Sequence, residues 1–295
     1  MKVLVFGSLN IDLLFFVDHI VKPGETINNS SFSKSAGGKG ANQAAALAKA
    51  GLQVYMAGKI GSDGQFILEL LKSYGINTDR VIRYDGETGQ AIIQIDKNGQ
   101  NSIILNSGGN KEITPKEVQE TISMFDSNDI IVLQNEIIHQ DLIIETAKKI
   151  GMRICINPSP LNEKIKSLPL NFADWIFVNE IEGAALAQLP PEADMQEILE
   201  KLTELFPKTE IILTAGKDGA FYGYGKTRAK SEIVKVPVVD TTAAGDTFTG
   251  YFLAAREKNM SVQQALSIAC KASAITVSKK GAMESIPYAK EIFEC

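Results

Sequence analysis

The sequence predicts a three-layer α/β fold, in which helices cover both faces of a mostly parallel sheet, with a small antiparallel β lid added. Short apolar runs alternate with helical patterns along the chain, and this alternation indicates parallel strands joined by helices. The expected strands are Val3–Phe6, Ile130–Leu133, Arg153–Ile156, Trp175–Val178 and Ile211–Leu213. The expected helices are Ala41–Ala50, Gln140–Ile150, Met195–Phe206 and Val262–Ser278. Ligands of such sheets bind at the carboxyl ends of the strands.

The lid is predicted by two stretches that depart from this pattern, Ile11–Ser35 and Thr88–Leu105. Both alternate like exposed antiparallel strands. The second reads as a hairpin with a turn at Lys97-Asn98-Gly99. Such a flap serves as a lid, as a dimer surface, or as both. Because no linker or internal repeat interrupts the chain, we expect one domain over residues 1–295.

The composition is that of an ordinary water-soluble protein, with 295 residues, 44% hydrophobic and 22% charged. A net charge of −5 argues against a nucleic-acid surface. No apolar run approaches the ~18 residues of a membrane span, and the first run is too short for a signal sequence, so we expect a cytoplasmic protein without membrane contact. Cys155, Cys270 and Cys295 are far apart, which favours reduced thiols over disulfides or a zinc site.

The segment Asp240-Thr-Thr-Ala-Ala-Gly-Asp246, which runs into Thr247–Gly250, is the strongest functional signal. Small residues bring bare backbone to the start of a helix, where unpaired N–H groups and the helix dipole attract an anion. The carboxylate of Asp246 then lies where a phosphate is expected. There it can accept a proton from a hydroxyl that attacks phosphorus. An N-capping Asp on an ordinary helix is the alternative.

Two polar clusters near the amino terminus suit a polyol. Asn10 and Asp12 follow the first strand and point to one side of an extended segment, whereas a dinucleotide-binding glycine fingerprint is absent there. A simple turn is the alternative. Further along, Gly37-Gly38 precedes Lys39 and Asn42, which face the same way at a helix start. Their spacing does not fit a P-loop, so we interpret them as contacts to a polar substrate rather than solvated side chains.

Polar residues also end three later strands. Glu136 is a candidate for a sugar hydroxyl, although a surface role is more common. Asn179 and Glu182 share one helix face and suit the water shell of magnesium, with helix capping as a close competitor. The glycine-rich turn Thr214–Gly219 suits a nucleotide or a hairpin equally well.

A final helix ends at Lys279-Lys280-Gly281, before Ser285-Ile286-Pro287. Locally this is a C-cap with basic residues at the negative end of the helix dipole. With Asp240 close by, the carbonyl groups of this loop are also able to surround a monovalent cation.

Taken in order, these pieces resemble the ribokinase branch of the PfkB sugar-kinase family over essentially the whole chain. The matching segments are Gly7–Asp12, Pro23–Thr26, Gly37–Gln43, Asn157–Pro160, Asp240–Phe248, Lys280–Ala282 and Ser285–Pro287. The resemblance implies a ribokinase-like α/β/α sandwich and transfer of the γ-phosphoryl group of ATP to the 5-hydroxyl of D-ribose. It also implies Mg²⁺, K⁺ and a homodimer joined through the lid.

The resemblance assigns roles by position. The base is Asp246, and the anion hole is formed by Ala243, Ala244 and Gly245. The sugar is held by Asn10, Asp12, Gly38, Lys39, Asn42, Glu136 and Asp246. The nucleotide is lined by Asn179, Thr214, Gly216, Gly219 and Gly245, with Cys270 near adenine. The potassium loop is matched by Asp240, Thr242, Thr276, Lys279, Gly281 and Ser285, and Glu182 is linked to magnesium through water.

Three departures from the family pattern leave the substrate open. The segment Asn106–Lys111 differs from the usual Gly-Ala-Asn, Lys279 replaces a more common Arg, and Cys270 replaces a polar residue. A PfkB-type kinase for another small sugar or a nucleoside is therefore the alternative. A non-catalytic sugar sensor is the alternative from another class, and the retained pairing of Gly245-Asp246 with Asn179 and Glu182 argues against it.

Overall fold

The computed structural model describes residues 1–294, with the side chains of Lys164 and Lys166 excepted. Within this part nine strands form one sheet in the order β13-β12-β11-β10-β9-β8-β1-β4-β5. The strands are β1 (Val3–Phe6), β4 (Val54–Ile60), β5 (Asn77–Arg83), β8 (Ile130–Gln134), β9 (Arg153–Asn157), β10 (Trp175–Asn179), β11 (Glu210–Thr214), β12 (Ala220–Tyr224) and β13 (Thr227–Ser231). All neighbours from β11 to β5 run parallel, whereas β12 and β13 add antiparallel pairs at one edge.

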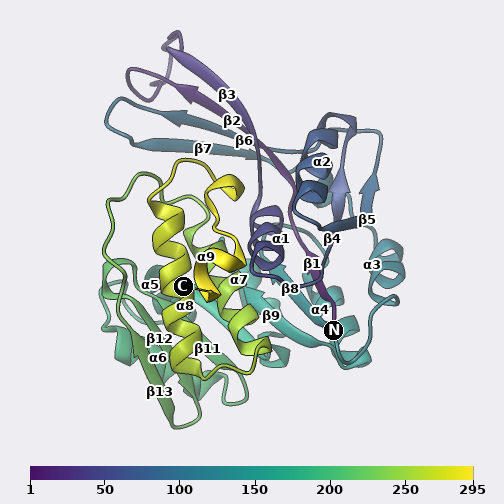
Figure 1. Ribbon diagram of the computed structural model, residues 1–295. Helices are drawn as coiled ribbons and strands as arrows, with labels where there is room; N and C mark the ends of the chain where they lie inside the picture. The colour runs from purple at the N-terminus through teal and green to yellow at the C-terminus, as the bar shows by residue number, and fades with distance from the viewer. Residues whose placement is uncertain (295) are drawn as a thin grey trace.

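Helices cover both faces of this sheet, so the predicted fold class is confirmed (Figure 1). They are α1 (Lys39–Lys49), α2 (Gln65–Ser73), α3 (Pro115–Ile122), α4 (Gln140–Ile150), α5 (Glu180–Leu186), α6 (Met195–Leu205), α7 (Ala244–Glu257), α8 (Val262–Val277) and α9 (Ala289–Phe293). Side chains alternate across a strand. Accordingly Val3 and Val5 of β1 join a core with α1, α2, α7, α8 and α9, while Leu4 and Phe6 join a second core with α3 to α6.

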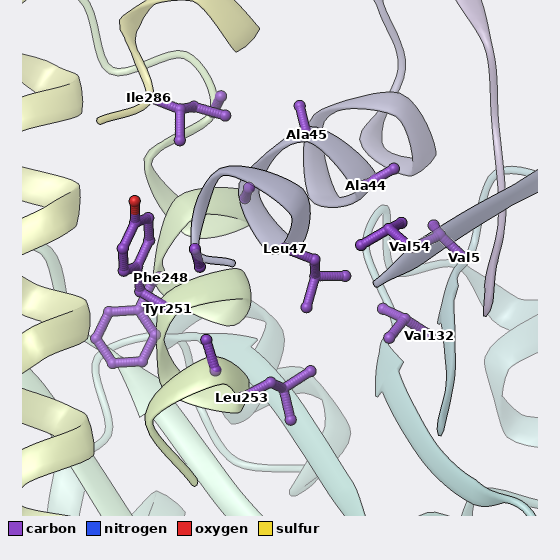
Figure 2. Close-up of a cluster of buried hydrophobic side chains, with 14 of the residues drawn as sticks. Val5, Ala44, Ala45, Leu47, Val54, Val132, Phe248, Tyr251, Leu253 and Ile286 are labelled. Carbon is purple, nitrogen blue, oxygen red and sulfur yellow. The ribbon is translucent and has the colours of Figure 1, made fainter. Parts of the chain in front are cut away.

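In the first core α1 packs against both α7 and strands β1 and β4, while α7 itself contacts β10 through Phe248 and Phe177. Figure 2 shows α1, with Ala44, Ala45 and Leu47, between the helix that carries Phe248 and Tyr251 and the strands that carry Val5, Val54 and Val132. The small alanines of α1 let the helix approach its neighbours closely. As a result, the first turns of α1 and α7 are held beside the carboxyl edge of the sheet.

The lid is a separate four-stranded sheet in the order β3-β2-β6-β7, which projects from the body of the molecule (Figure 1). Its strands are β2 (Asn10–Phe16), β3 (Ser31–Gly37), β6 (Gly89–Ile95) and β7 (Asn101–Asn106). The expected β6–β7 hairpin is confirmed, and the carboxylate of Asp96 accepts the Asn98 and Gln100 N–H groups in its turn. The outer pairs are antiparallel, but β2 and β6 run parallel because each enters the lid separately from the body.

Cys155 and Cys270 are buried free thiols, as expected, whereas Cys295 lies outside the described residues. Within residues 1–294, no helix combines the length and the apolar character needed to cross a bilayer.

Candidate active site

Two adjoining cavities lie at the carboxyl edge of the large sheet. The first, of about 940 Å³, is enclosed by lid strands on one side and by the ends of β9, β10 and β11 on the other. The second, of about 610 Å³, continues toward α8 and is lined by Cys270. Asn179, Thr214, Ala244 and Gly245 line both. The start of α7 therefore lies where the two cavities meet.

The start of α7 has the features of an anion site. Ala243, just before the helix, adopts the left-handed backbone conformation with φ 61°, which L-residues other than Gly, Asn and Asp rarely adopt. The N–H of Ala244 donates to Thr241 and that of Thr247 to Ala243. Between them, the N–H groups of Gly245 and Asp246 make no hydrogen bond within residues 1–294. A Cβ built on Gly245 would meet nothing within 4 Å, and Gly245 lines both cavities, so open space lies beside these donors.

Asp246 is the ionisable group at this junction. Its Oδ1 accepts a hydrogen bond of 3.0 Å from the Gln43 amide. Burial raises the pKa of the Asp246 carboxyl, and Glu136 adds to this effect, while Lys39, Gln43 and Asn42 oppose it. A carboxylate with a raised pKa is a better proton acceptor, which suits a general base.

The floor of the first cavity holds Asn10 and Asp12 on β2. Asn10 Oδ1 accepts a 2.7 Å hydrogen bond from Asn110 Nδ2, and Asn110 Oδ1 accepts the Leu9 N–H at 3.1 Å. Because the Leu9 donor fixes the Asn110 amide, the Asn10 NH₂ group is left to face a ligand. Burial, together with the nearby Glu136 carboxylate, raises the pKa of Asp12 to about 7.

Lys39 and Glu136 complete this polar floor. One oxygen of the Glu136 carboxylate accepts the Lys39 N–H at 3.0 Å and the Ser8 hydroxyl. Burial disfavours the charge of Lys39, but the surrounding carboxylates outweigh burial and raise its pKa. These carboxylates are Asp246, Glu136 and Glu182. A permanently charged ammonium is therefore available to an anion that enters the cavity.

Asn179 and Glu182 form a capping box at the start of α5. Asn179 Oδ1 accepts the Glu182 N–H at 2.8 Å, and Glu182 Oε2 accepts the Asn179 N–H at 3.1 Å. The prediction that these two residues cap a helix is therefore confirmed. Both residues also line the first cavity, so capping fixes two polar side chains beside the anion site.

The turn Thr214–Gly219 connects β11 to β12 as a hairpin and also lines the second cavity. Gly216 and Gly219 have φ values of 41° and 89°, where a side chain would be strained. A Cβ on Gly219 would also collide with the Ser231 carbonyl. Burial raises the pKa of the Cys270 thiol on the opposite wall, although a hydrogen bond with Ser231 counteracts it, so the thiol lines the cavity in its neutral form.

The proposed cation loop brings Asp240 beside the segment after α8. Asp240 Oδ2 accepts the Gly281 N–H at 3.1 Å, and Asp240 Oδ1 accepts from the N–H and hydroxyl of Thr242. The other residues of this set lie away from both cavities. Thr276 is buried against Thr247, Lys279 pairs with Glu291 at 3.7 Å, and the Ser285 hydroxyl donates to Ala282.

The structure thus brings the sequence-predicted residues together in two groups. The sugar candidates Asn10, Asp12, Gly38, Lys39, Asn42, Glu136 and Asp246 all line the first cavity. The nucleotide candidates Asn179, Thr214, Gly216, Gly219, Gly245 and Cys270 all line the second. Among described residues, no cluster of three or more His, Cys, Asp or Glu side chains converges as a metal site.

Sequence reasoning missed the buried polar residues behind this site. Gln43 and Gln134 support Asp246, Asn110 supports Asn10, and Ser8 supports Glu136. Only Asn110 carried a signal, since an asparagine after two glycines at a strand end indicates a close backbone approach. Gln43 ends the matching segment Gly37–Gln43 but nothing local assigns it a role, and Gln134 lies in a buried strand that no motif covers.

Two adjoining cavities that meet at an anion site, with a carboxylate beside it, fit the class of a phosphotransferase that binds two substrates. A family model described as pfkB family carbohydrate kinase matches residues 1–289. A ribokinase of Staphylococcus aureus (strain COL) is 35% identical over 303 residues, which cover 99% of this chain and 98% of that protein. The chain belongs to the pfkB family of carbohydrate kinases.

Solved structures of ribokinases have the same fold as this chain. Ribokinase from Cryptococcus neoformans var. grubii serotype A in complex with ADP has a TM-score of 0.86 and 35% identity, with 99% of this chain and 98% of that chain covered. Arabidopsis thaliana ribokinase complexed with ribose and ATP has a TM-score of 0.87 and 30% identity, with 99% and 97% covered.

Proposed function

We propose that this kinase transfers the γ-phosphoryl group of ATP to the 5-hydroxyl of D-ribose, giving ribose 5-phosphate and ADP. The observation that carries the proposal is the position of Asp246 and the free Gly245 and Asp246 N–H groups where two differently lined cavities meet. Full-length similarity to ribokinases, two of them solved with ADP or with ribose and ATP, supports the choice of substrates.

In this mechanism the Asp246 carboxylate accepts the proton of the attacking hydroxyl. Phosphoryl transfer has a loose transition state, so the protein mainly positions reactants and neutralises charge. The backbone of Ala243, Ala244 and Gly245 directs fixed N–H dipoles at the transferring group. In other enzymes one such donor is worth roughly 3 kcal/mol. Lys39, whose ammonium stays charged, neutralises the charge that develops on the phosphoryl oxygens.

The sugar hydroxyls are bound in the first cavity. The NH₂ of Asn10 donates and the carboxylate of Asp12 accepts, so neighbouring hydroxyls meet groups of opposite hydrogen-bonding character. The remaining sugar contacts are assigned to Gly38, Lys39, Asn42 and Glu136. Apolar lid residues such as Ile103 and Leu105 line the lid side of the cavity and are suited to exclude water once a sugar is bound.

The nucleotide is assigned to the second cavity. Thr214, Gly216 and Gly219 provide close backbone approach on one wall, and Cys270 provides an apolar contact for adenine on the other. Asn179 lies near the junction, on the phosphate side. This arrangement directs the γ-phosphate toward Gly245.

The residues present fit a magnesium ion that keeps most of its water. One carboxylate oxygen of Glu182 accepts the Asn179 N–H, and the other is available to the water shell of Mg²⁺. Mg²⁺ would supply charge neutralisation on the phosphates. A single carboxylate is consistent with the lack of a multi-residue metal cluster in the described chain.

Potassium fits the loop formed by Asp240, Thr242, Thr276, Lys279, Gly281 and Ser285, mainly through main-chain oxygens. Within residues 1–294 no hydrogen bond ends on the carbonyl oxygens of Thr242, Lys279 or Gly281. The carboxylate of Asp240 ties the two halves of this loop together. The loop leads through Thr242 into the anion site, so a cation bound here helps to position Ala243 and Gly245.

We further propose one domain over residues 1–295, a cytoplasmic location, and a homodimer joined through the lid. The lid carries exposed apolar side chains, among them Phe32 at 52% and Ile104 at 60% exposure, which suit a second copy. Another small sugar or a nucleoside remains the alternative substrate.

A coupled assay of ADP release with magnesium-ATP tests the proposal, using pentoses, hexoses and nucleosides with and without KCl. We expect the highest kcat/KM on D-ribose and a rise with potassium. Turnover on another compound alone would move the substrate assignment, and lack of turnover on the whole panel would favour a sugar sensor.

A further inference from the structure

Two buried side-chain amides connect Asp246 to the central sheet. The Gln43 Nε2 donates to Asp246 Oδ1 at 3.0 Å, and Gln134 Nε2 donates to Gln43 Oε1 at 2.7 Å. Gln43 is 1% exposed and Gln134 is 0% exposed, and neither lines a cavity. They therefore act on a ligand only through Asp246.

The direction of this chain is fixed by chemistry. An ionised carboxylate only accepts hydrogen bonds, so Gln43 must present its NH₂ group to Asp246 and its carbonyl oxygen to Gln134. Gln134 must then present its own NH₂ group. Its Oε1 is left buried without a hydrogen-bond partner among the described residues. An orphaned buried acceptor costs free energy, so stability alone does not explain this arrangement.

The fold brings these residues together through close helix packing. A Cβ on Gly250 of α7 would collide with Ala46 of α1, so glycine lets the two helices touch. Gln43 lies three residues before Ala46, and Asp246 lies four residues before Gly250. The two contacts follow the same order along both helices, so α1 and α7 run in the same general direction and their first turns meet. On the sheet side, Gly7 leaves room for the Gln134 amide.

We propose that Gln134 and Gln43 form an amide relay that positions the Asp246 carboxylate and reserves its second oxygen, Oδ2, for the proton of the sugar hydroxyl. Both are positioning residues. The inference rests on the role of Asp246 as base in the proposed function. Gln134 sets the orientation of the Gln43 amide, and Gln43 holds the carboxylate plane.

The relay also sets the pH range of the reaction. Burial raises the pKa of Asp246 most, and the Glu136 carboxylate adds to this effect. Lys39, Gln43 and Asn42 also face Asp246 and lower its pKa. Removal of the Gln43 donor raises the pKa of Asp246. Since the base must be ionised, the acid limb of kcat then moves to higher pH.

The test compares Gln43→Met, Gln134→Met and the double variant in the full-length enzyme. Gln43→Met is expected to lower kcat about tenfold, the scale of a hydrogen bond to a charged group, and to shift the acid limb upward. Gln134→Met is expected to produce a smaller change in the same direction. KM for the sugar and for ATP is expected to stay close to wild type.

The double variant separates catalysis from folding. It removes both partners of the Gln43–Gln134 hydrogen bond and the unpartnered Gln134 oxygen, so only Asp246 Oδ1 loses a donor; its Tm is expected to fall no further than that of Gln43→Met, while kcat remains low. Thr209→Val is the matched control, because it removes a buried hydrogen bond to Ala173 far from Asp246. It is expected to lower Tm and leave the pH profile unchanged.

Folded variants with the wild-type kcat and acid limb would overturn the relay. Asp246→Asn, measured in parallel, distinguishes this outcome from failure of the proposed function. An inactive Asp246→Asn beside unaltered glutamine variants would refute the relay alone. An active Asp246→Asn would refute the base assignment itself.

Discussion

The body of the molecule and the lid are built in opposite ways. All four residues of β1 are buried, whereas five of the six residues of β7 are exposed. On the body side, Asp246 accepts a hydrogen bond from Gln43, and at the base of the lid strand β2 Asn10 accepts a buried one from Asn110. The lid contributes mainly apolar side chains to the cavity. We infer that the polar groups assigned to binding and catalysis are held in place by hydrogen bonds, whereas the lid depends little on the position of any single side chain.

The largest effect on kcat is expected at Asp246, in the body of the molecule. Asp246→Asn removes the proton acceptor and a buried charge, so kcat is expected to fall by a factor of about 10² to 10⁴. Tm and the KM for ATP are expected to change little, because the amide keeps the shape of the side chain. Steady-state kinetics with thermal unfolding checks this, and wild-type turnover would exclude Asp246 as the base.

Gly245→Ala tests whether the anion hole is shaped for a ligand. The added Cβ meets no protein atom but enters the space beside the free N–H groups, so kcat is expected to fall about a hundredfold with Tm unchanged. Gly250→Ala is the contrasting control. Its Cβ collides with the α1 backbone at Ala46 and Leu47, so Tm is expected to drop. Equal losses of stability in the two variants would contradict this distinction.

The pH dependence of sugar binding tests the floor of the cavity. Burial raises the pKa of Asp12 to about 7, so lowering the pH through 7 protonates an acceptor of the sugar. KM for the sugar is expected to rise as the pH falls below 7, and to be high and pH-independent in Asp12→Asn. A wild-type KM that stays constant from pH 6 to 8 would rule out this role.

The raised pKa of Asp12 also makes the free energy of unfolding depend on pH. In the folded state Asp12 keeps its proton up to a pKa of about 7, whereas the unfolded chain releases it near 3.8, the ordinary pKa of an aspartate. The folded state binds more protons in this window, so stability falls as the pH rises from about 4 to about 7. Asp12→Asn is expected to flatten this part of the stability profile.

The smallest effect on the active site is expected in the lid. Ile104 is 60% exposed, so Ile104→Asp is expected to change the free energy of unfolding of the single subunit by less than about 0.5 kcal/mol. It is expected to shift the proposed homodimer toward monomer in light scattering. An unchanged mass would remove this face from the dimer interface.

Local patterns in the sequence were sufficient for much of this structure. The end of β1 at Gly7, the extent of α4 and the β6–β7 hairpin follow from apolar runs, helical periodicity and a glycine turn. The anion site was predictable because small residues before Asp246 leave the backbone bare. These signals lie within a few residues of one another along the chain.

Features that depend on distant pairing could not be predicted in this way. The parallel β2–β6 pair joins strands about 80 residues apart, and nothing within either strand sets its direction. The contact between Gln43 and Asp246 spans 203 residues and requires Gly250 to let α1 and α7 touch. Gln134 and Asn110 likewise act through tertiary contacts alone.

The most direct test of the two-cavity account is a crystal structure with D-ribose and a non-hydrolysable ATP analogue. We expect a primary hydroxyl within hydrogen-bond distance of the Asp246 carboxylate and the terminal phosphate at the Gly245 N–H. A sugar bound without a hydroxyl near Asp246, or a nucleotide outside the cavity lined by Cys270, would contradict it.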